Sequence, residues 1–207
     1  MVPRHRGDSR VARPPMSAAR LVWSDIKRCV DADHKRLSPA EVANYLLTPG
    51  IGALATHRFA HAFYVRGLRL PARLLRLIGN ALFSADIHEG TEIGPGCNMN
   101  HATGIVISGA RIGANVTIMA NVALGARGWE DHARDGYPVV HDGAVIFTGA
   151  KVFGPIVIGK GAMIGANAVV LESIPDGMIA SGIPAKIVKA APERSFPAAD
   201  SVGARAS

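Results

Sequence analysis

The most constraining feature of the sequence is a six-residue recurrence of aliphatic residues after residue 86. Glycine often follows the aliphatic directly, and the fourth position after it is usually small or β-branched. A period of six fits neither an amphipathic helix nor simple strand alternation. It is typical of the hexapeptide repeats of a parallel β-helix, in which each repeat contributes one short strand and one turn. The recurrence occupies Ile87, Ile93, Met99, Ile105 and, after a one-residue slip, Ile112, Ile118, Leu124, then Val140, Ile146, Val152, Ile158, Ile164 and Val170.

These thirteen repeat starts predict a mainly β domain over residues 86–190, wound into about four coils whose aliphatics stack inward. The composition agrees, because 48% of the residues are hydrophobic but only 5% are aromatic, as thin aliphatic layers require. Val140 lies sixteen positions after Leu124, where continued winding needs a step of six or twelve. We therefore expect residues 126–138 to leave the coil as a long loop, the kind of segment in which binding sites are common.

Residues 17–85 have a helical pattern instead and predict a small α-helical subdomain. The stretch SPAEV has the features of a helix start, with Ser38 as the N-cap, Pro39 at the first position and Glu41 at the third. Amphipathic segments follow over residues 53–67 and 70–83. His57 and His61 have metal-ligand spacing on such a helix, but without a third ligand nearby we interpret them as packing or interface residues.

The net charge of +7 is concentrated near the N-terminus. Residues 1–85 hold 14 Lys/Arg against 5 Asp/Glu, and residues 86–207 hold 9 against 11. Because residues 1–16 are basic and poor in apolar residues, we expect a disordered leader rather than a nucleic-acid site, and a flexible tail over 191–207. The sequence contains no apolar run long enough for a membrane span, and its two cysteines favour a reducing, cytoplasmic setting.

Several motifs together resemble the serine acetyltransferases, members of the left-handed β-helix, hexapeptide-repeat acyltransferase superfamily. They are DIH at 86–88, NHATGIVI at 100–107, VALGARG at 122–128 and GIPAKIV at 182–188. The resemblance extends over about residues 22–190. It implies acetyl transfer from acetyl-CoA to a hydroxyl without a metal, at a site shared between neighbouring subunits of a trimer or of paired trimers.

On the matching positions the resemblance implies that His101 is the general base and Asp86 the carboxylate that orients it. An alcohol must lose a proton as it attacks a thioester, and an imidazole suits that task at neutral pH. A carboxylate on the other ring nitrogen fixes the tautomer and stabilises the imidazolium. The two residues are 15 apart, which predicts consecutive coils near one corner. Backbone N–H groups around Gly125 are candidates for the oxyanion site.

On the donor side, the late coils resemble the CoA channel of that family. Small residues at Ala162, Gly165, Ala180 and Gly182 are expected to let the pantetheine arm lie against the wall, and Lys186 to meet CoA phosphates. Cys29 lies in a predicted helix and Cys97 in a small-residue slot of the repeat. Neither is suited to carry an acyl group, so we expect direct transfer in a ternary complex.

The departures from the family pattern fall in the acceptor pocket. Asn100 stands where the family usually has aspartate, and Gly136-Tyr137 stands where an Arg-His pair usually precedes the closing proline. Tyr137 thus replaces the second family histidine, whose role His132 could take by folding back, and Asp33 loosely matches an aspartate that grips the acceptor's amino group. We therefore expect a serine-like or modified amino acid to be a better acceptor than free L-serine.

Two alternatives belong to other classes. One is a metal enzyme on the same scaffold, for which the prism offers only His88, His101, His132 and His141, without the usual paired spacing. The other is a non-catalytic trimeric partner that has lost acyl transfer. Family members that bind the sulfhydrylase do so through a C-terminal isoleucine. Because the chain ends FPAADSVGARAS, we expect no such complex.

Overall fold

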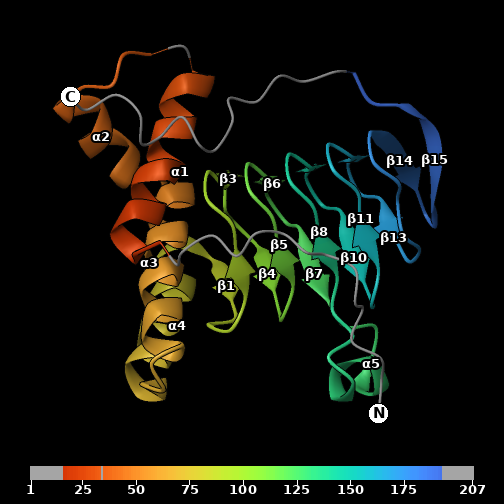
Figure 1. Ribbon diagram of the computed structural model, residues 1–207, viewed down its shortest axis with the longest axis horizontal. Coiled ribbons are helices and arrows are strands. Elements are labelled where there is room, and N and C mark those ends of the chain that lie inside the picture. Colours follow the sequence, from red (N-terminus) through yellow and green to blue (C-terminus); the bar gives the residue numbers. More distant parts are fainter. Residues whose placement is uncertain (1–15, 34, 193–207) are drawn as a thin grey trace.

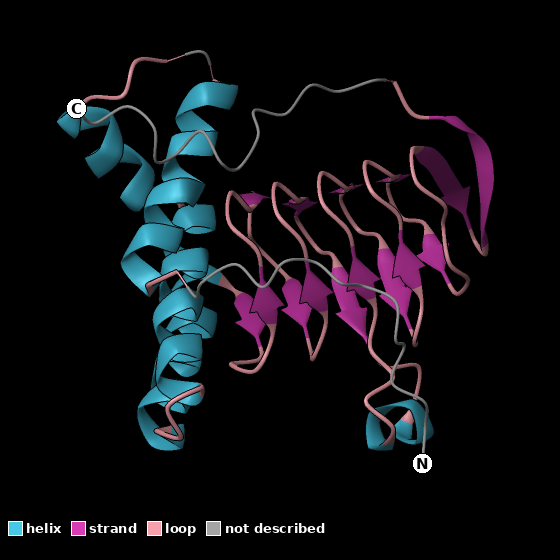
Figure 2. Cartoon of the chain, viewed as in Figure 1, coloured by secondary structure: helices cyan, strands magenta, loops and turns pink. Residues whose placement is uncertain are grey.

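A computed structural model describes residues 16–33 and 35–192. Helices form the first part of this region and a parallel β-helix the second, and Figures 1 and 2 show the helices standing across one end of the coil. The segments predicted as a basic leader and a flexible tail lie almost entirely outside the described residues. The four N-terminal helices are α1 (Ala18–Ala32), α2 (Pro39–Leu46), α3 (Pro49–Tyr64) and α4 (Arg69–Phe83).

The start of α2 follows the predicted capping pattern. The Ser38 side chain accepts a hydrogen bond from the Glu41 backbone N–H at 3.2 Å, and Pro39 occupies the first turn. No helix within residues 16–33 and 35–192 has the length and hydropathy needed to cross a lipid bilayer.

The strands of the β-helix form three faces, and neighbouring strands within each face are parallel except for the last pair. One face contains β1 (Ala85–Ile87), β4 (Ile105–Ile107), β7 (Ala123–Gly125), β10 (Lys151–Phe153) and β13 (Val169–Val170). The second contains β2 (Glu92–Ile93), β5 (Arg111–Ile112), β8 (Val139–Val140) and β11 (Val157–Ile158). The third contains β3 (Asn98–Asn100), β6 (Thr117–Met119), β9 (Val145–Ile146), β12 (Met163–Ile164), β14 (Met178–Gly182) and the antiparallel β15 (Ala185–Ala190).

The predicted parallel β-helix is confirmed, with five strands stacked on the first face where about four coils were expected. Its core consists of aliphatics in register, such as Ile118, Ile146 and Ile164, each fully buried. Each coil thus buries the aliphatic layer of the next, so the winding is stabilised along the stack.

One predicted stacking position is wrong. The register aligns Ile87 with Ile107 and Ile107 with Leu124, so Ile107 and not Ile105 continues the stack. The step from Met99 to Ile107 is therefore eight residues where the repeat has six. The two additional residues enlarge the turn between β3 and β4, which contains His101.

The long loop after β7 leaves the coil as expected and contains the short helix α5 (Trp129–Ala133), which projects from the side of the prism (Figure 1). On its return the ring of Tyr137 lies against Gly109. A Cβ added at Gly109 would come within 2.6 Å of that ring, and the residue has a φ of +64°. Glycine at this position therefore allows the returning loop to pack on the coil.

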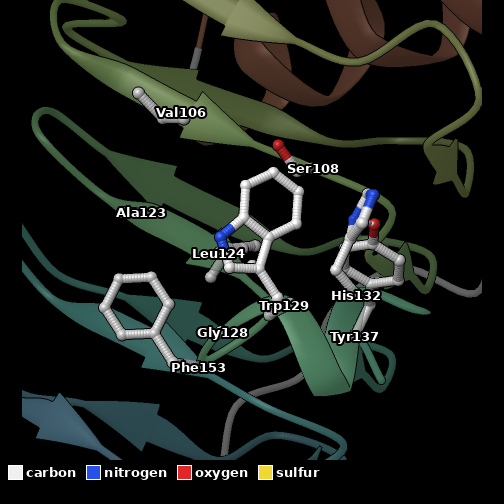
Figure 3. A pocket seen from close by; sticks show the side chains of 11 residues that line it. Val106, Ser108, Ala123, Leu124, Gly128, Trp129, His132, Tyr137 and Phe153 are labelled. Carbon is white, nitrogen blue, oxygen red and sulfur yellow. Dashed lines mark hydrogen bonds between the residues drawn. The ribbon is translucent and has the colours of Figure 1, made fainter. Parts of the chain in front are cut away.

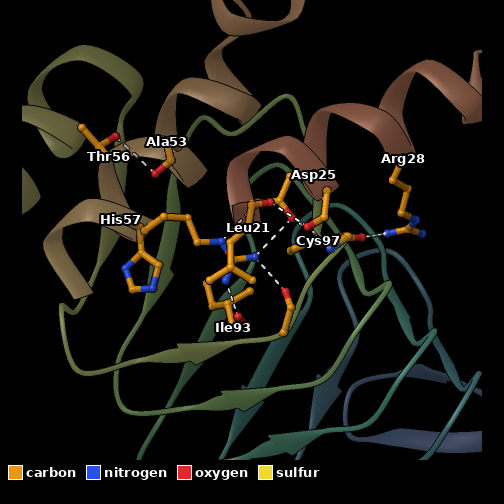
Figure 4. A network of polar contacts seen from close by, with 12 residues as sticks. Leu21, Asp25, Arg28, Ala53, Thr56, His57, Ile93 and Cys97 are labelled. Carbon is orange, nitrogen blue, oxygen red and sulfur yellow. Dashed lines mark hydrogen bonds and ion pairs between the residues drawn. The ribbon is translucent and has the colours of Figure 1, made fainter. Parts of the chain in front are cut away.

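A buried polar network joins the helices to the first coil (Figure 4). Arg58 of α3 pairs with Asp25 of α1 at 3.1 and 3.2 Å and donates a hydrogen bond to the Gly94 carbonyl at 2.7 Å. Asp25 also accepts a hydrogen bond from the Cys97 backbone N–H at 2.9 Å. The network satisfies backbone groups of the first coil that have no preceding coil to bond.

His57 and His61 belong to the same junction, which supports their interpretation as packing residues. The Nε2 of His57 lies 3.1 Å from the Thr91 carbonyl oxygen, and the Nδ1 of His61 lies 2.9 Å from that of Glu89. Burial lowers the pKa of His57 to about 3, so its ring is neutral. The two rings therefore bind α3 to the first turn of the β-helix.

Candidate active site

His101 lies in the enlarged turn between β3 and β4, with its side chain exposed. Its φ is +53°, a left-handed conformation that costs a non-glycine residue of order 1 kcal/mol or more. Below this turn, the Gly104 N–H donates to the Ser84 carbonyl at 2.8 Å. The turn that carries His101 thus stands on the coil that carries Asp86, as the sequence spacing predicts.

Within the chain, however, the carboxylate of Asp86 is bonded to Arg76 of α4. The Nε of Arg76 lies 2.6 Å from Oδ1 and its NH2 group 3.1 Å from Oδ2, a bidentate arrangement. The hydrogen bond to Asp86 raises the pKa of Arg76. In the part of the chain that the structure describes, no hydrogen bond joins Asp86 to His101.

Glu89 extends this charged cluster. Its buried carboxylate lies 3.3 Å from Arg76 and 3.7 Å from Arg73, both on α4. Burial opposes ionisation of Glu89, but bonds to its own backbone and to Arg76, together with nearby His88, keep its pKa below the ordinary value. Arg76 is therefore shared between two carboxylates and fixes Asp86 against α4.

A pocket of about 490 Å³ lies where the long loop meets the first face of the β-helix (Figure 3). In this view the indole of Trp129 lies between Phe153 and the pair His132 and Tyr137. Three predicted site residues, Gly125, His132 and Tyr137, line it, while His101 and Asp86 do not. The full lining set is Val106, Ser108, Ala123, Leu124, Gly125, Ala126, Gly128, Trp129, His132, Tyr137 and Phe153.

The structure places His132 next to Tyr137 in the loop. The Nδ1 of His132 lies 2.5 Å from the phenolic oxygen of Tyr137, and Trp129 packs edge-on against the His132 ring with centroids 6.0 Å apart. His132 thus lies beside Tyr137, the residue that the family resemblance aligns with the second family histidine.

The other two predicted acceptor residues lie elsewhere. Asn100 ends β3 beside His101 and is exposed. Asp33 caps the C-terminus of α1 and accepts a hydrogen bond from the Tyr45 hydroxyl. The two are thus placed near the helical end of the molecule, and neither lines the pocket.

The predicted donor-side residues divide into two groups. Ala162 and Ala180 are fully buried in the core, so their side chains face inward and cannot touch a ligand on the outer wall. The predicted pantetheine contacts are therefore wrong for these two. Gly165 is half-buried next to Ser181, and Gly182 and Lys186 are exposed on β14 and β15.

The cysteines have the properties expected of structural residues. Cys29 and Cys97 are free and buried, and burial raises the pKa of each thiol to about 12. Such thiols are poor nucleophiles near neutral pH, which supports direct transfer. Among residues 16–33 and 35–192, no group of three or more His, Cys, Asp or Glu side chains is arranged to hold a metal ion.

Three residues that form the sites were missed at the level of sequence. Arg76 is one of several arginines on an amphipathic helix, so nothing in the sequence distinguished it. Trp129 had a signal, because a tryptophan in a loop that cannot join the core is a candidate ligand contact. Phe153 follows a core aliphatic in its repeat, and this outward position could have indicated that it faces the loop.

Comparison with known proteins gives consistent results, although no family model matches the chain. The serine acetyltransferase of Bacillus pumilus is 39% identical over 170 residues, 82% of this chain and 76% of that protein. That of Mycobacterium tuberculosis is 42% identical over 141 residues, 68% of this chain and 61% of that protein.

Solved structures agree with these sequence matches. A serine acetyltransferase from Brucella abortus has a TM-score of 0.74 and 32% identity, covering 84% of this chain and 70% of that one. A serine acetyltransferase in complex with CoA has a TM-score of 0.73 and 34% identity, covering 83% and 69%. The predicted fold class, a left-handed parallel β-helix after a helical region, is confirmed. The chain therefore belongs to the serine acetyltransferase family of acyltransferases.

Proposed function

We propose that the protein transfers the acetyl group of acetyl-CoA to the hydroxyl of a serine-like acceptor, with His101 as general base. The observation that carries this proposal is the enlarged turn, which contains the exposed His101 and is hydrogen-bonded through Gly104 to the coil of Asp86. The CoA complex of a structural relative supports the choice of donor.

In the proposed reaction, the acceptor oxygen attacks the thioester carbonyl carbon while its proton passes to the free ring nitrogen of His101. A carbon–oxygen bond forms, the carbon–sulfur bond breaks, and the proton held by His101 passes to the leaving CoA thiolate. Backbone N–H groups near Gly125 are candidates to stabilise the tetrahedral oxyanion.

The grip of Arg76 on Asp86 is compatible with a role for Asp86 beside His101. An ionised carboxylate has about four lone-pair sites, and Arg76 uses two. Asp86 can therefore accept a further bond from the His101 ring while Arg76 holds it in place. Such a bond fixes the tautomer of the base.

We further propose that the working form is a trimer, alone or paired, with each site between two subunits. Within one chain His101 does not line the loop pocket, and both His101 and Trp129 are exposed. A neighbouring subunit that brings its loop to this corner would complete the site. We expect the protein to be cytoplasmic, and we expect it to form no complex with the sulfhydrylase.

Free L-serine is expected to be a poor acceptor. Its carboxylate would lack the arginine that precedes the second histidine in the family, because Gly136 occupies that position. A charge-assisted bond of this kind contributes about 1.5–3 kcal/mol, which is about a tenfold to hundredfold change in affinity. A modified amino acid or serine-like metabolite fits the altered pocket better.

Thiol release from acetyl-CoA, measured with a panel of hydroxy amino acids, tests the proposal. Wild type is expected to release CoA with at least one acceptor, and His101→Ala to lose about 10²–10⁴-fold in rate. His141→Ala, a half-buried histidine on another turn, serves as the matched control. Equal rates for His101→Ala and wild type would refute the assignment, and transfer that requires bound metal would favour the metal-enzyme alternative.

A further inference from the structure

We infer that the loop pocket selects an acceptor whose groups flanking the hydroxyl are uncharged and aromatic or apolar, as in an N-acylated, esterified serine. Trp129 and Tyr137 are assigned as the specificity-determining residues. The inference rests on the proposed function, because it names the acceptor class of that same site.

The residues that line the pocket are mainly apolar or uncharged. Among the described residues that line the pocket there is no Lys, Arg, Asp or Glu, and His132 is the one titratable imidazole. These lining residues offer no charged partner to a zwitterion such as free serine, and loss of water without one is costly in an apolar site. An acceptor whose amine is acylated and whose carboxylate is esterified avoids that cost.

The guanidinium of Arg127 does not supply the missing charge. Arg127 lies between two lining residues but does not itself line the pocket. Its Nε is 3.5 Å from the carboxylate of Asp131, one turn away on the same loop. Its charge is therefore already partnered by a residue of the loop.

Trp129 provides an exposed aromatic surface in the pocket. The residue is 87% exposed although it forms part of the pocket wall. Phe153 and Leu124 line the same pocket as Trp129, so a planar or apolar group bound there would meet an apolar surface. A bound aromatic group would cover the indole and gain its burial.

The Tyr137 hydroxyl is oriented by its contact with His132. Its oxygen lies 2.5 Å from Nδ1 of His132. In the tautomer that has its proton on Nε2, His132 accepts the Tyr137 proton and leaves the phenolic lone pairs free. These lone pairs suit a donor such as the amide N–H of an acylated amino acid.

Three acceptors separate charge from aromatic character. They are L-serine, N-acetyl-L-serine methyl ester, which has no charges, and N-benzoyl-L-serine methyl ester, which adds a ring. We expect kcat/KM for acetyl-CoA-dependent transfer to rise in that order, by about tenfold or more from first to last. A higher value for L-serine than for either ester would overturn the inference.

Two tryptophan variants locate the effect. Trp129→Ala is expected to lower kcat/KM for the benzoyl ester about tenfold and to leave that for the acetyl ester nearly unchanged. Trp23→Ala, on α1 with 42% exposure, is the matched control and should change neither. An equal loss for all three acceptors in Trp129→Ala would indicate a structural role and contradict the assignment.

Two further measurements keep the inference apart from the proposed function. Arg127→Gln should leave the order of kcat/KM among the three acceptors unchanged. A rise in KM for L-serine alone would show that Arg127 binds the acceptor carboxylate, which would contradict the inference. Calorimetric binding of the benzoyl ester to the enzyme with CoA tests the pocket without turnover. Binding that weakens in Trp129→Ala but not in Trp23→Ala supports the pocket even if transfer fails, and absence of binding refutes it.

Discussion

Arg76 is the residue whose place in the site is most specific to the three-dimensional structure. It reaches from α4 to both oxygens of Asp86 and to Glu89, so it fixes the carboxylate that we assign to support His101. Side chains that orient a reactive group are often as important as the group itself.

We predict that Arg76→Gln lowers kcat about tenfold with little change in the KM for acetyl-CoA, because Asp86 loses its bidentate partner. Arg73→Gln is the matched control on the same helix, since its side chain is 73% exposed and lies 3.7 Å from the carboxylate of Glu89. Steady-state kinetics check both. Equal effects of the two variants would show that Arg76 acts only through general charge.

For individual residues, the sequence predicted which side chains are candidates for the site but not whether each points into the core or outward. The motifs around His101 and Asp86 predicted adjacent coils, which the register bears out. Ala162 and Ala180 were assigned to the donor channel because they are small, yet they are small because they fill the core. The partner of Asp86 depends on how α4 packs on β1, which no local pattern encodes.

Among the described residues, most of the buried polar and charged side chains lie at the junction between the helices and the first coil. Asp25 is fully buried and Arg58 is 3% exposed, and both bond backbone groups of the coil. Removal of one partner would leave the other charge buried and unpaired.

Asp25→Ala is therefore expected to lower the free energy of unfolding by about 3–5 kcal/mol. Lys35→Ala, which breaks the exposed pair with Glu41, should cost at most about 1 kcal/mol. Urea unfolding of both variants, with wild type alongside, measures the difference. Similar midpoints for the two would mean that the buried network adds nothing to stability.

His57 predicts a pH dependence at the same junction. Burial lowers its pKa to about 3, so below about pH 6.5 the unfolded chain takes up a proton that the folded chain refuses. Stability is then lost by about 1.4 kcal/mol per pH unit as the pH falls further. Burial raises the pKa of Asp25 to about 6, which acts in the opposite sense between about pH 4 and 6.

Because of that opposition, the comparison of wild type with His57→Gln isolates the histidine. When the pH is lowered from 7.5 to 5.5, the free energy of unfolding of wild type should fall by about 1 kcal/mol relative to that of the variant. The same difference in both proteins would contradict the role assigned to this ring.

Helices and strands could be predicted where a local pattern, such as a repeat or a capping residue, marks them. They were less predictable where a turn differs in length from the repeat. The hexapeptide recurrence located most of the strands, and Ser38 located the start of α2. The six-residue period selects Ile105 after Met99, although the structure continues the stack at Ile107 and buries both residues. The register could be decided only by pairing with Ala85 and Ile87.

At the scale of the whole molecule, the proposed base and the loop pocket lie apart within one chain. His101 belongs to the turn of an early coil, whereas Trp129 and Tyr137 belong to a loop that projects from the side (Figure 1). The helix α4 also leaves large apolar side chains exposed, among them Leu70, Leu77 and Leu82. Both features are expected of a subunit rather than of a complete enzyme.

Light scattering on the purified protein checks this expectation. The predicted mass is three or six times the 21.7 kDa of the chain, and dilution to monomers should abolish transfer. A fully active monomer would contradict a site shared between subunits.

The central claim is that Asp86 and His101 act as one unit across adjacent coils, and a double-mutant cycle on kcat/KM tests it most directly. We expect His101→Ala to lose about 10²–10⁴-fold, Asp86→Asn to lose less, and the double variant to match His101→Ala within about threefold. Losses that simply multiply in the double variant would show that the two residues act independently, and would contradict the account.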